Sequence, residues 1–198
     1  MGKRTVLHQK REKQKRNTTV AVLAGFGFIF LAVVAFMALS SSSVGSAGGG
    51  TGLSTIPIEV NYQAPALALE NIKGSTESLA DFHNQVVLVN NWATWCPPCK
   101  AEMPTLVAFY NAHAKDGLII VAIEAGEPKD QVQKFADEYQ MPFSVWLDPQ
   151  GKALDAFKNG SLPNSYVIDR TGTVRLMWTG EINRETLEKY VTPLITGN

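Results

Sequence analysis

Apolar residues gather in three runs that indicate where the chain crosses a membrane and where it forms a core. Residues 20–39 contain no charge, and residues 85–92 and 117–125 are shorter runs dominated by β-branched and other apolar side chains. A helix of about twenty residues rises roughly 30 Å, the thickness of the hydrocarbon core of a bilayer. The two shorter runs are typical of strands covered on both faces. We therefore predict one membrane-spanning helix and two central strands.

Helical spacing follows each of the two central strands. Apolar residues recur at intervals of three or four after residue 96 and again after residue 128, which predicts helices over 97–114 and 129–139. In the second helix, Val132, Phe135 and Ala136 form the inward side. The other predicted elements are short strands at 66–71 and 143–148, a turn or short helix at 76–84, a helical turn at 153–157, a hairpin at 164–182 that turns at 170–172, and a final helix after a cap at Asn183.

The order of these elements predicts an α/β fold. Strands joined through helices are parallel and a closing hairpin adds antiparallel strands, so we expect a mixed central sheet with helices on both faces. The folded domain is placed at residues 56–198, a length that one hydrophobic core can stabilise. Before it we place a basic tail at 1–17, the transmembrane anchor at 18–39 and a flexible Ser/Gly-rich linker at 40–55.

The charge distribution gives the predicted membrane helix an orientation. Residues 1–17 carry seven Lys or Arg and one Glu, a net charge of +6, while the remaining eleven basic and seventeen acidic residues give −6. Positive flanks stay in the cytoplasm, so we expect a cytoplasmic N-terminus and an extracytoplasmic domain on a single-pass anchor. A cleaved signal peptide is the alternative, although apolar signal regions are about 7–15 residues long. In either case disulfides can persist around the domain.

The chain has two cysteines, Cys96 and Cys99, within the stretch NNWATWCPPCKAEMP. Because a helix is predicted to begin at Pro97, Cys96 lies where free N–H groups and the helix dipole favour a thiolate and lower the pKa of the thiol. Cys96 is therefore the expected nucleophile and the more exposed sulfur, and Cys99, one turn further on, is the expected resolving thiol. Pro97 and Pro98 suit a first helical turn, where a missing N–H costs nothing.

Two non-catalytic roles for the cysteines are weaker alternatives. A structural disulfide that closes so short a loop adds little stability, because the stabilisation grows with loop length. A structural zinc site needs four ligands, whereas the chain has two cysteines, and His83 and His113 show no ligand spacing. We expect no metal and no cofactor.

The segments VVLVNNWATWCPPCKAEMP, LIIVAI, LPNSYVID and RTGTV, in this order, resemble the thioredoxin superfamily. The chain is most similar to the membrane-anchored thiol–disulfide oxidoreductases of the TlpA and ResA type, over about residues 64–194. The resemblance implies a thioredoxin-like fold and catalysis by Cys96 and Cys99. Related peroxiredoxins carry a Thr three residues before the cysteine with a proline upstream, whereas here Thr94 lies two residues before Cys96 and no such proline precedes it.

The resemblance also assigns supporting residues. It implies that Pro163 follows a cis bond and faces the cysteines, so that the Leu162 backbone can pair with an extended substrate. Trp95 is expected to shield Cys96 and to contact partners. Thioredoxin carries a buried Asp where this chain has Asn90, and in the ResA branch a glutamate matching Glu102 supplies the carboxylate. One helical turn from Cys99, Glu102 can accept or donate the resolving proton, the alternative being a solvated surface glutamate.

The sequence assigns no role to three further residues. Asn91 stands where relatives usually carry an aromatic residue, and Asn164 stands where many carry Thr. A polar side chain at an apolar position needs hydrogen-bond partners, which the sequence does not identify for Asn91. Glu124 ends the second central strand, a place where α/β sheets carry functional groups, although such an acid is more often solvated.

Together these features predict a membrane-tethered extracytoplasmic thiol–disulfide oxidoreductase. We expect it to act as a reductase on disulfides of exported proteins and to receive electrons from a separate membrane donor, as relatives do in cytochrome c maturation. A disulfide-forming oxidase, a thioredoxin-like peroxidase and a non-catalytic tethered binding module are the alternatives. We expect a monomer that binds no nucleic acid.

Overall fold

The computed structural model describes residues 56–197. Its strands are β1 (Ile58–Gln63), β2 (Ala68–Asn71), β3 (Thr76–Ser78), β4 (Val86–Trp92), β5 (Leu118–Glu124), β6 (Ser144–Leu147), β7 (Asn164–Ile168) and β8 (Thr173–Thr179). Its helices are α2 (Pro97–His113), α3 (Lys129–Glu138), α4 (Lys152–Ala156), α5 (Arg184–Tyr190) and α6 (Thr192–Thr196), with short 3-10 turns η2 (Leu79–Phe82) and η3 (Ala114–Asp116).

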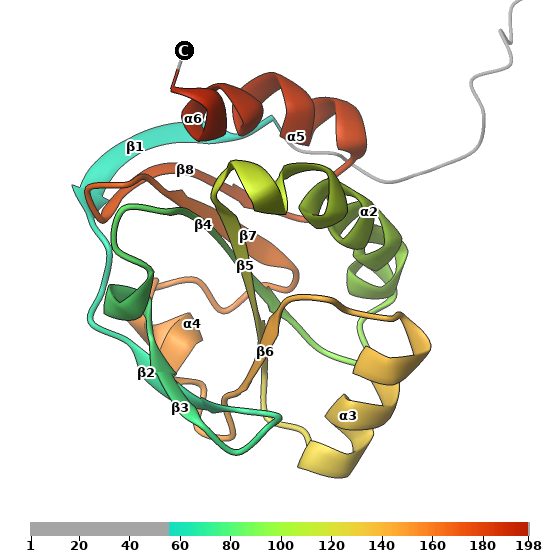
Figure 1. The fold of residues 1–198 in the computed structure, drawn as a ribbon. Helices are drawn as coiled ribbons and strands as arrows, with labels where there is room; N and C mark the ends of the chain where they lie inside the picture. The colour runs from blue at the N-terminus through green and yellow to red at the C-terminus, as the bar shows by residue number, and fades with distance from the viewer. Residues whose placement is uncertain (1–55, 198) are drawn as a thin grey trace, which may run out of the picture. The chain divides into compact units, whose positions relative to one another are not determined.

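The strands form one mixed sheet in the order β1-β8-β7-β4-β5-β6-β2-β3 (Figure 1). The central strands β4, β5 and β6 are parallel, and β7, β8 and β1 continue the sheet antiparallel on one side. On the other side β2 pairs antiparallel with β6 and with β3. The predicted mixed α/β sheet is therefore confirmed.

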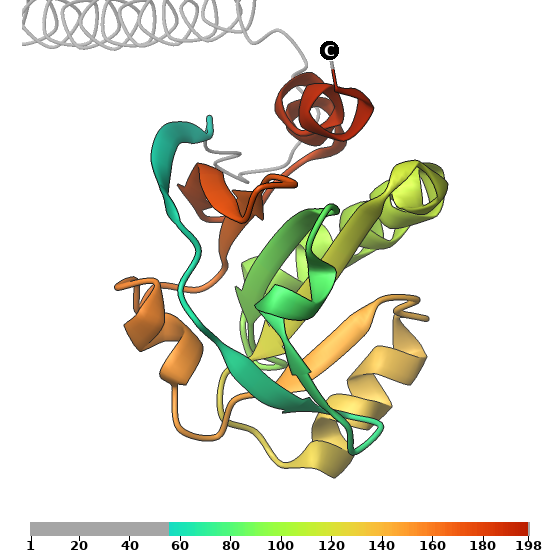
Figure 2. The same cartoon turned by 60° about the vertical axis from the view of Figure 1, so that its left-hand side comes forward.

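The sheet separates two hydrophobic clusters, because successive side chains of a strand point to opposite faces. Val86, Leu88 and Trp92 of β4 belong to the cluster beneath α2, α3, α5 and α6, whereas Val87 and Val89 belong to the cluster that contains residues of α4. Figure 2 shows α2 and α4 on opposite sides of the strands. All seven residues of β4 are buried, as expected for a strand covered on both faces.

The structure adds two strands, β1 and β3, and divides a helix that the sequence predicted as continuous. β1 was not predicted, although Ile58, Val60 and Tyr62 alternate with polar residues, because it is an exposed edge strand outside the core pattern. Where the sequence predicts a turn or short helix at 76–84, residues 76–78 form a short strand and residues 79–82 a 3-10 turn. The final helix is broken at Val191, and Pro193 lies in the first turn of α6, where its missing N–H is tolerated. The predicted cap at Asn183 is confirmed, since its side chain accepts from the Thr186 N–H.

The predicted tail, membrane helix and linker lie outside the described residues. Within residues 56–197 no helix is both long and apolar enough to cross a membrane. The boundaries at residues 17, 39 and 55 stay predictions. The described domain carries every predicted site residue.

Candidate active site

The cysteines lie where β4 gives way to α2, joined by a short loop that starts after Trp92. Cys96 and Cys99 form a disulfide, and Cys96 is the N-cap residue of α2. The Cys96 sulfur accepts a hydrogen bond from the Cys99 N–H at 3.3 Å. Pro97 and Pro98 occupy the first two helical positions, where no N–H is needed. The first free donor of the helix is therefore aimed at the Cys96 sulfur, which favours negative charge on that atom.

The two cysteines are both buried, whereas residues next to Cys96 are exposed. Cys96 is 3% exposed and Cys99 is fully buried, so the difference has the predicted direction but is small. Trp95 is 65% exposed and Pro97 is also exposed. Large exposed aromatic side chains are favoured at protein interfaces. The surface next to Cys96 is thus suited to contact a partner protein.

Glu102 is a buried carboxylate on the same inward face of α2 as Cys99. Its Oε1 accepts from the Asn90 side-chain amide at 2.8 Å, and its Oε2 accepts from the Ile182 N–H at 3.1 Å. The same Asn90 amide donates to the Ser165 hydroxyl at 2.9 Å. The structure therefore brings Asn90 and Glu102 together, and the alternative of a solvated glutamate is wrong.

Burial raises the pKa of Glu102 to about 8 from an ordinary 4.5, and the Asn90 and Ile182 hydrogen bonds oppose this only in part. A carboxyl group with this pKa holds its proton at neutral pH yet can release it. Its pKa is close to that of an ordinary thiol, roughly 8.5. Proton transfer is most efficient between groups of matched pKa. The arrangement can therefore move a proton next to the cysteine pair.

Leu162 and Pro163 come to the same end of the sheet as the cysteine loop. β7 runs antiparallel to β4, with Asn164 opposite Asn91, so the residues just before β7 lie beside the end of β4. The Leu162–Pro163 bond is cis, as the resemblance implies. Pro163 is buried, and its carbonyl accepts from the Gly180 N–H at 2.8 Å. Leu162 packs against the cluster that contains both cysteines.

The sequence did not identify Glu127, which holds the cysteine loop from the segment between β5 and α3. Its carboxylate accepts from both the N–H and the hydroxyl of Thr94, two residues before Cys96. Glu124 in turn accepts from the Glu127 N–H at 2.9 Å. Glu124 is buried rather than solvated, and burial raises its pKa to about 7. An acid three residues beyond a strand forms no pattern that could point to this contact.

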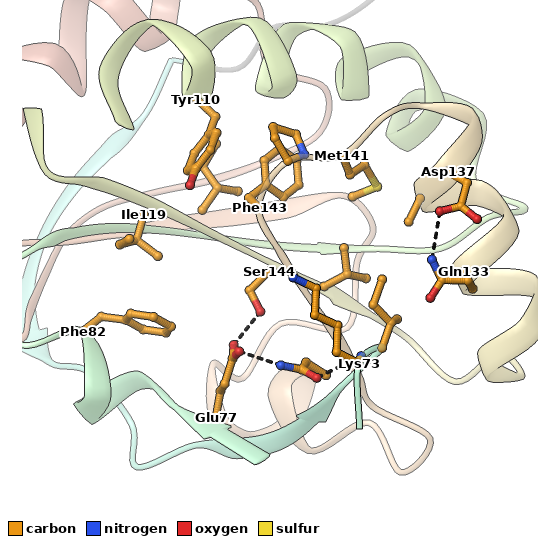
Figure 3. A pocket seen from close by; sticks show the side chains of 16 residues that line it. Lys73, Glu77, Phe82, Tyr110, Ile119, Gln133, Asp137, Met141, Phe143 and Ser144 are labelled. Carbon is orange, nitrogen blue, oxygen red and sulfur yellow. Dashed lines mark hydrogen bonds between the residues drawn. The ribbon is translucent and has the colours of Figure 1, made fainter. Parts of the chain in front are cut away.

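A pocket of about 370 Å³ lies elsewhere on the domain (Figure 3). No lining residue belongs to the cysteine loop or to the Leu162–Pro163 segment. One of its two carboxylates, Glu77, already accepts hydrogen bonds from Asn71, Ser144 and Trp146. These contacts join β2 and β3 to β6, and the other carboxylate, Asp137, accepts from Gln133 within α3. Both carboxylates of this pocket are thus hydrogen-bonded within the domain.

A cysteine pair that begins a helix after a buried strand, next to a cis-proline before an antiparallel strand, defines a thioredoxin-like protein. Among curated proteins, the thiol-disulfide oxidoreductase ResA of Geobacillus kaustophilus is 36% identical over 68% of this chain and 77% of that protein. ResA of Bacillus anthracis is 32% identical over 68% of this chain and 78% of that protein.

A solved structure from Chlorobium tepidum, provisionally named thiol:disulfide interchange protein DsbE, matches with a TM-score of 0.65 and 26% identity over 70% of this chain and 99% of that chain. The model of the AhpC/TSA family matches residues 60–177. The chain belongs to the AhpC/TSA family and, within it, to the thiol–disulfide oxidoreductases of the ResA type. The predicted family and class of enzyme are thereby confirmed.

Proposed function

We propose that this protein is a membrane-tethered, extracytoplasmic reductase of disulfides in partner proteins and that Cys96 and Cys99 carry the exchange. The observation that carries the proposal is the position of Cys96 as the N-cap of α2, with its sulfur facing the Cys99 N–H and bonded to Cys99. The same position would stabilise a Cys96 thiolate in the reduced enzyme. Relatives named for thiol–disulfide exchange support the same activity.

The reduced enzyme begins the reaction at Cys96. The Cys96 thiolate attacks one sulfur of the partner disulfide, the other partner sulfur leaves as a thiolate, and a mixed disulfide forms. The Cys99 thiolate then attacks the Cys96 sulfur and releases the second partner thiolate. Two electrons have passed to the partner, and the enzyme is left with the Cys96–Cys99 disulfide. A separate dithiol donor must reduce it again.

Glu102 supplies the proton transfer in the resolving step. Cys99 is fully buried, so bulk water is poorly placed to remove its proton. The ionised form of Glu102, on the same buried face of α2, takes that proton as Cys99 attacks. Asn90 holds the carboxylate in place and cannot itself titrate at this position.

The partner is an exported protein that presents a disulfide in an extended segment. The backbone of Leu162 pairs with that segment, since Pro163 has no N–H of its own, and exposed Trp95 adds apolar contact. Residues 18–39 anchor the domain to the membrane next to its electron donor. We propose cytochrome c maturation, the process that the family resemblance implies, as the setting here.

Trapping of the mixed disulfide tests this proposal. In the Cys99→Ala variant the intermediate cannot be resolved, so an intact-cell extract prepared under acid quench should contain a disulfide-linked adduct on Cys96. The Cys96→Ser variant is the control and should yield no adduct. Recovery of equal amounts from both variants, or of none from either, would count against exchange through Cys96. Turnover of hydrogen peroxide by the wild-type enzyme would instead favour a peroxidase.

The direction of electron flow has its own measurement. A reduction potential of the Cys96–Cys99 couple near −270 mV, typical of thioredoxin, would support a reductase. A value near −120 mV would support a disulfide-forming oxidase with the same residues.

A further inference from the structure

The unassigned residues Asn91 and Asn164 are hydrogen-bonded to each other. They are directly opposite on β4 and β7, and both side chains are buried. The Asn91 amide donates to Asn164 Oδ1 at 2.8 Å. Neither residue has a partner that could be predicted from the sequence, and in the structure each is the partner of the other.

Asn164 extends this contact to the loop before the cis-proline. Its amide donates to the Ser161 carbonyl at 2.6 Å and approaches the Asn159 carbonyl at 3.3 Å. The Asn159 side chain accepts from the Ser161 N–H at 3.1 Å, and its amide donates to the Thr179 hydroxyl at 3.0 Å. Residues 159–163 contain no helix or strand. Backbone bonds hold the two ends of this segment, from the Asn159 N–H to the Leu154 carbonyl and from the Gly180 N–H to the Pro163 carbonyl. The side-chain bonds of Asn164 and Asn159 hold the residues between them.

The direction of the Asn91–Asn164 bond follows from its neighbours. Backbone carbonyls only accept, so Asn164 must point its amide at Ser161 and Asn159 and its oxygen at Asn91. Asn91 must then donate. Neither side chain titrates, so the connection has the same form at any pH at which the enzyme works.

We propose that Asn91 and Asn164 are positioning residues that fix the Leu162 backbone in the geometry that receives an extended substrate segment. This inference rests on the proposed function. Binding an extended chain is costly when the receiving backbone must first be ordered, and prior ordering removes that cost. Asn91 lies on the strand that leads to the cysteine loop, so the same contact relates the substrate-pairing segment to the strand that positions Cys96.

The test compares a substrate that has a peptide backbone with one that has none. Reduced enzyme is mixed with a ten-residue peptide carrying a central glutathionylated cysteine, and separately with 5,5′-dithiobis(2-nitrobenzoate). For Asn91→Leu, we expect the ratio of the peptide rate constant to the small-disulfide rate constant to fall about tenfold, the effect of losing one buried hydrogen bond. Asn164→Leu also loses the bonds to Ser161 and Asn159 and should lower the ratio by at least as much. The double variant should lose no more than the larger single effect, because the two residues act in one chain of contacts.

Asn71→Leu is the matched control. Asn71 is a buried asparagine that accepts from Lys73 and Ser75 and donates to Glu77, away from the loop at 159–163. The Asn71→Leu variant should lower the midpoint of thermal unfolding. It should leave the ratio of the peptide rate constant to the small-disulfide rate constant unchanged. Hydrogen exchange provides a second measurement if a leucine variant folds poorly: in Asn164→Ala, the Ser161 amide should exchange at least tenfold faster relative to the core amides of β4.

Two results would overturn the inference. One is an unchanged rate ratio in folded Asn91→Leu and Asn164→Leu, and the other is unchanged exchange at Ser161 in Asn164→Ala. Neither would affect the proposed function, provided that the wild-type enzyme reacts with both disulfides. A wild-type enzyme that reacts with neither would instead refute the proposed function.

Discussion

Asn90 and Asn91 are neighbours on β4, are both buried, and reach opposite faces of the sheet. Asn90 points to the face covered by α2 and donates to Glu102. Asn91 points to the face that carries α4 and donates to Asn164. Asn90 thus binds an acid, Glu102, whose pKa is raised to about 8. Asn91 is linked through Asn164 to backbone carbonyls before the Leu162–Pro163 bond.

This difference separates two requirements of disulfide exchange. The α2 face has to move a proton when Cys99 attacks, and for this it needs a group that titrates near the working pH. The opposite face has to hold a segment of backbone in one position, and for this a group that never titrates is better suited. A single strand supplies both because adjacent side chains alternate across the sheet. Changes on the two faces should therefore have effects of different kinds.

The largest effect is expected for Glu102→Gln. Glutamine keeps the size of the side chain but cannot accept a proton, so the resolving step should slow by about a hundredfold, in the range for loss of a general base. The enzyme forms a mixed disulfide on Cys96 with the peptide or the glutathione of a glutathionylated peptide. The measurement is the release of that peptide or glutathione as a free thiol, followed by rapid quench between pH 6 and 9. Glu185→Gln changes an exposed glutamate and is the control. If the resolving rate of Glu102→Gln kept the wild-type pH profile, the proton would be leaving by another route.

The next effect concerns stability. The pKa of Glu102 is 4.5 when unfolded and about 8 when folded, so its stabilising contribution is complete below pH 4.5 and is lost as the pH rises to 8. In that interval the unfolded chain releases a proton that the folded chain keeps. Each such group lowers the free energy of unfolding by about 1.4 kcal/mol per pH unit. Urea unfolding of the oxidised protein at pH 5 to 8 should show this decline, and Glu102→Gln should flatten it above pH 7.

The strands and the helix that position the site could be predicted from the sequence, because they depend on the local pattern of residues. The buried runs placed β4 and β5, and the position of two prolines after Cys96 placed the start of α2. The contacts of Asn91 with Asn164 and of Glu127 with Thr94 could not be predicted in the same way. They join residues 73 and 33 positions apart, and they depend on strand register and on the path of a loop. The burial of Glu102 required both the helix face and the Ile182 segment that covers it.

A smaller effect is expected for Glu124→Gln, on the strand next to β4. Burial raises the pKa of Glu124 to about 7, so its contribution to stability is lost between pH 4.5 and 7. In Glu124→Gln, the free energy of unfolding should decline less steeply with pH below pH 7. Its decline between pH 7 and 8, which is caused by Glu102, should remain. Urea unfolding at pH 5, 6, 7 and 8 distinguishes the two groups. A change in the slope above pH 7 would show that the two carboxyl groups are coupled.

The smallest effect is expected for Ser165→Ala. This variant tests whether Ser165 only orients the Asn90 side chain or also takes part in proton transfer at Glu102. The Ser165 hydroxyl accepts one hydrogen of the Asn90 amide, while Glu102 accepts the other. Its loss leaves one buried N–H unpaired and should cost about 1 kcal/mol of stability. Because the Glu102 contact remains, the cost should be the same at pH 5 and at pH 8. A cost confined to pH 8 would mean that Ser165 helps to stabilise the ionised carboxylate and belongs to the proton-transfer network, which would extend that network from β4 to β7.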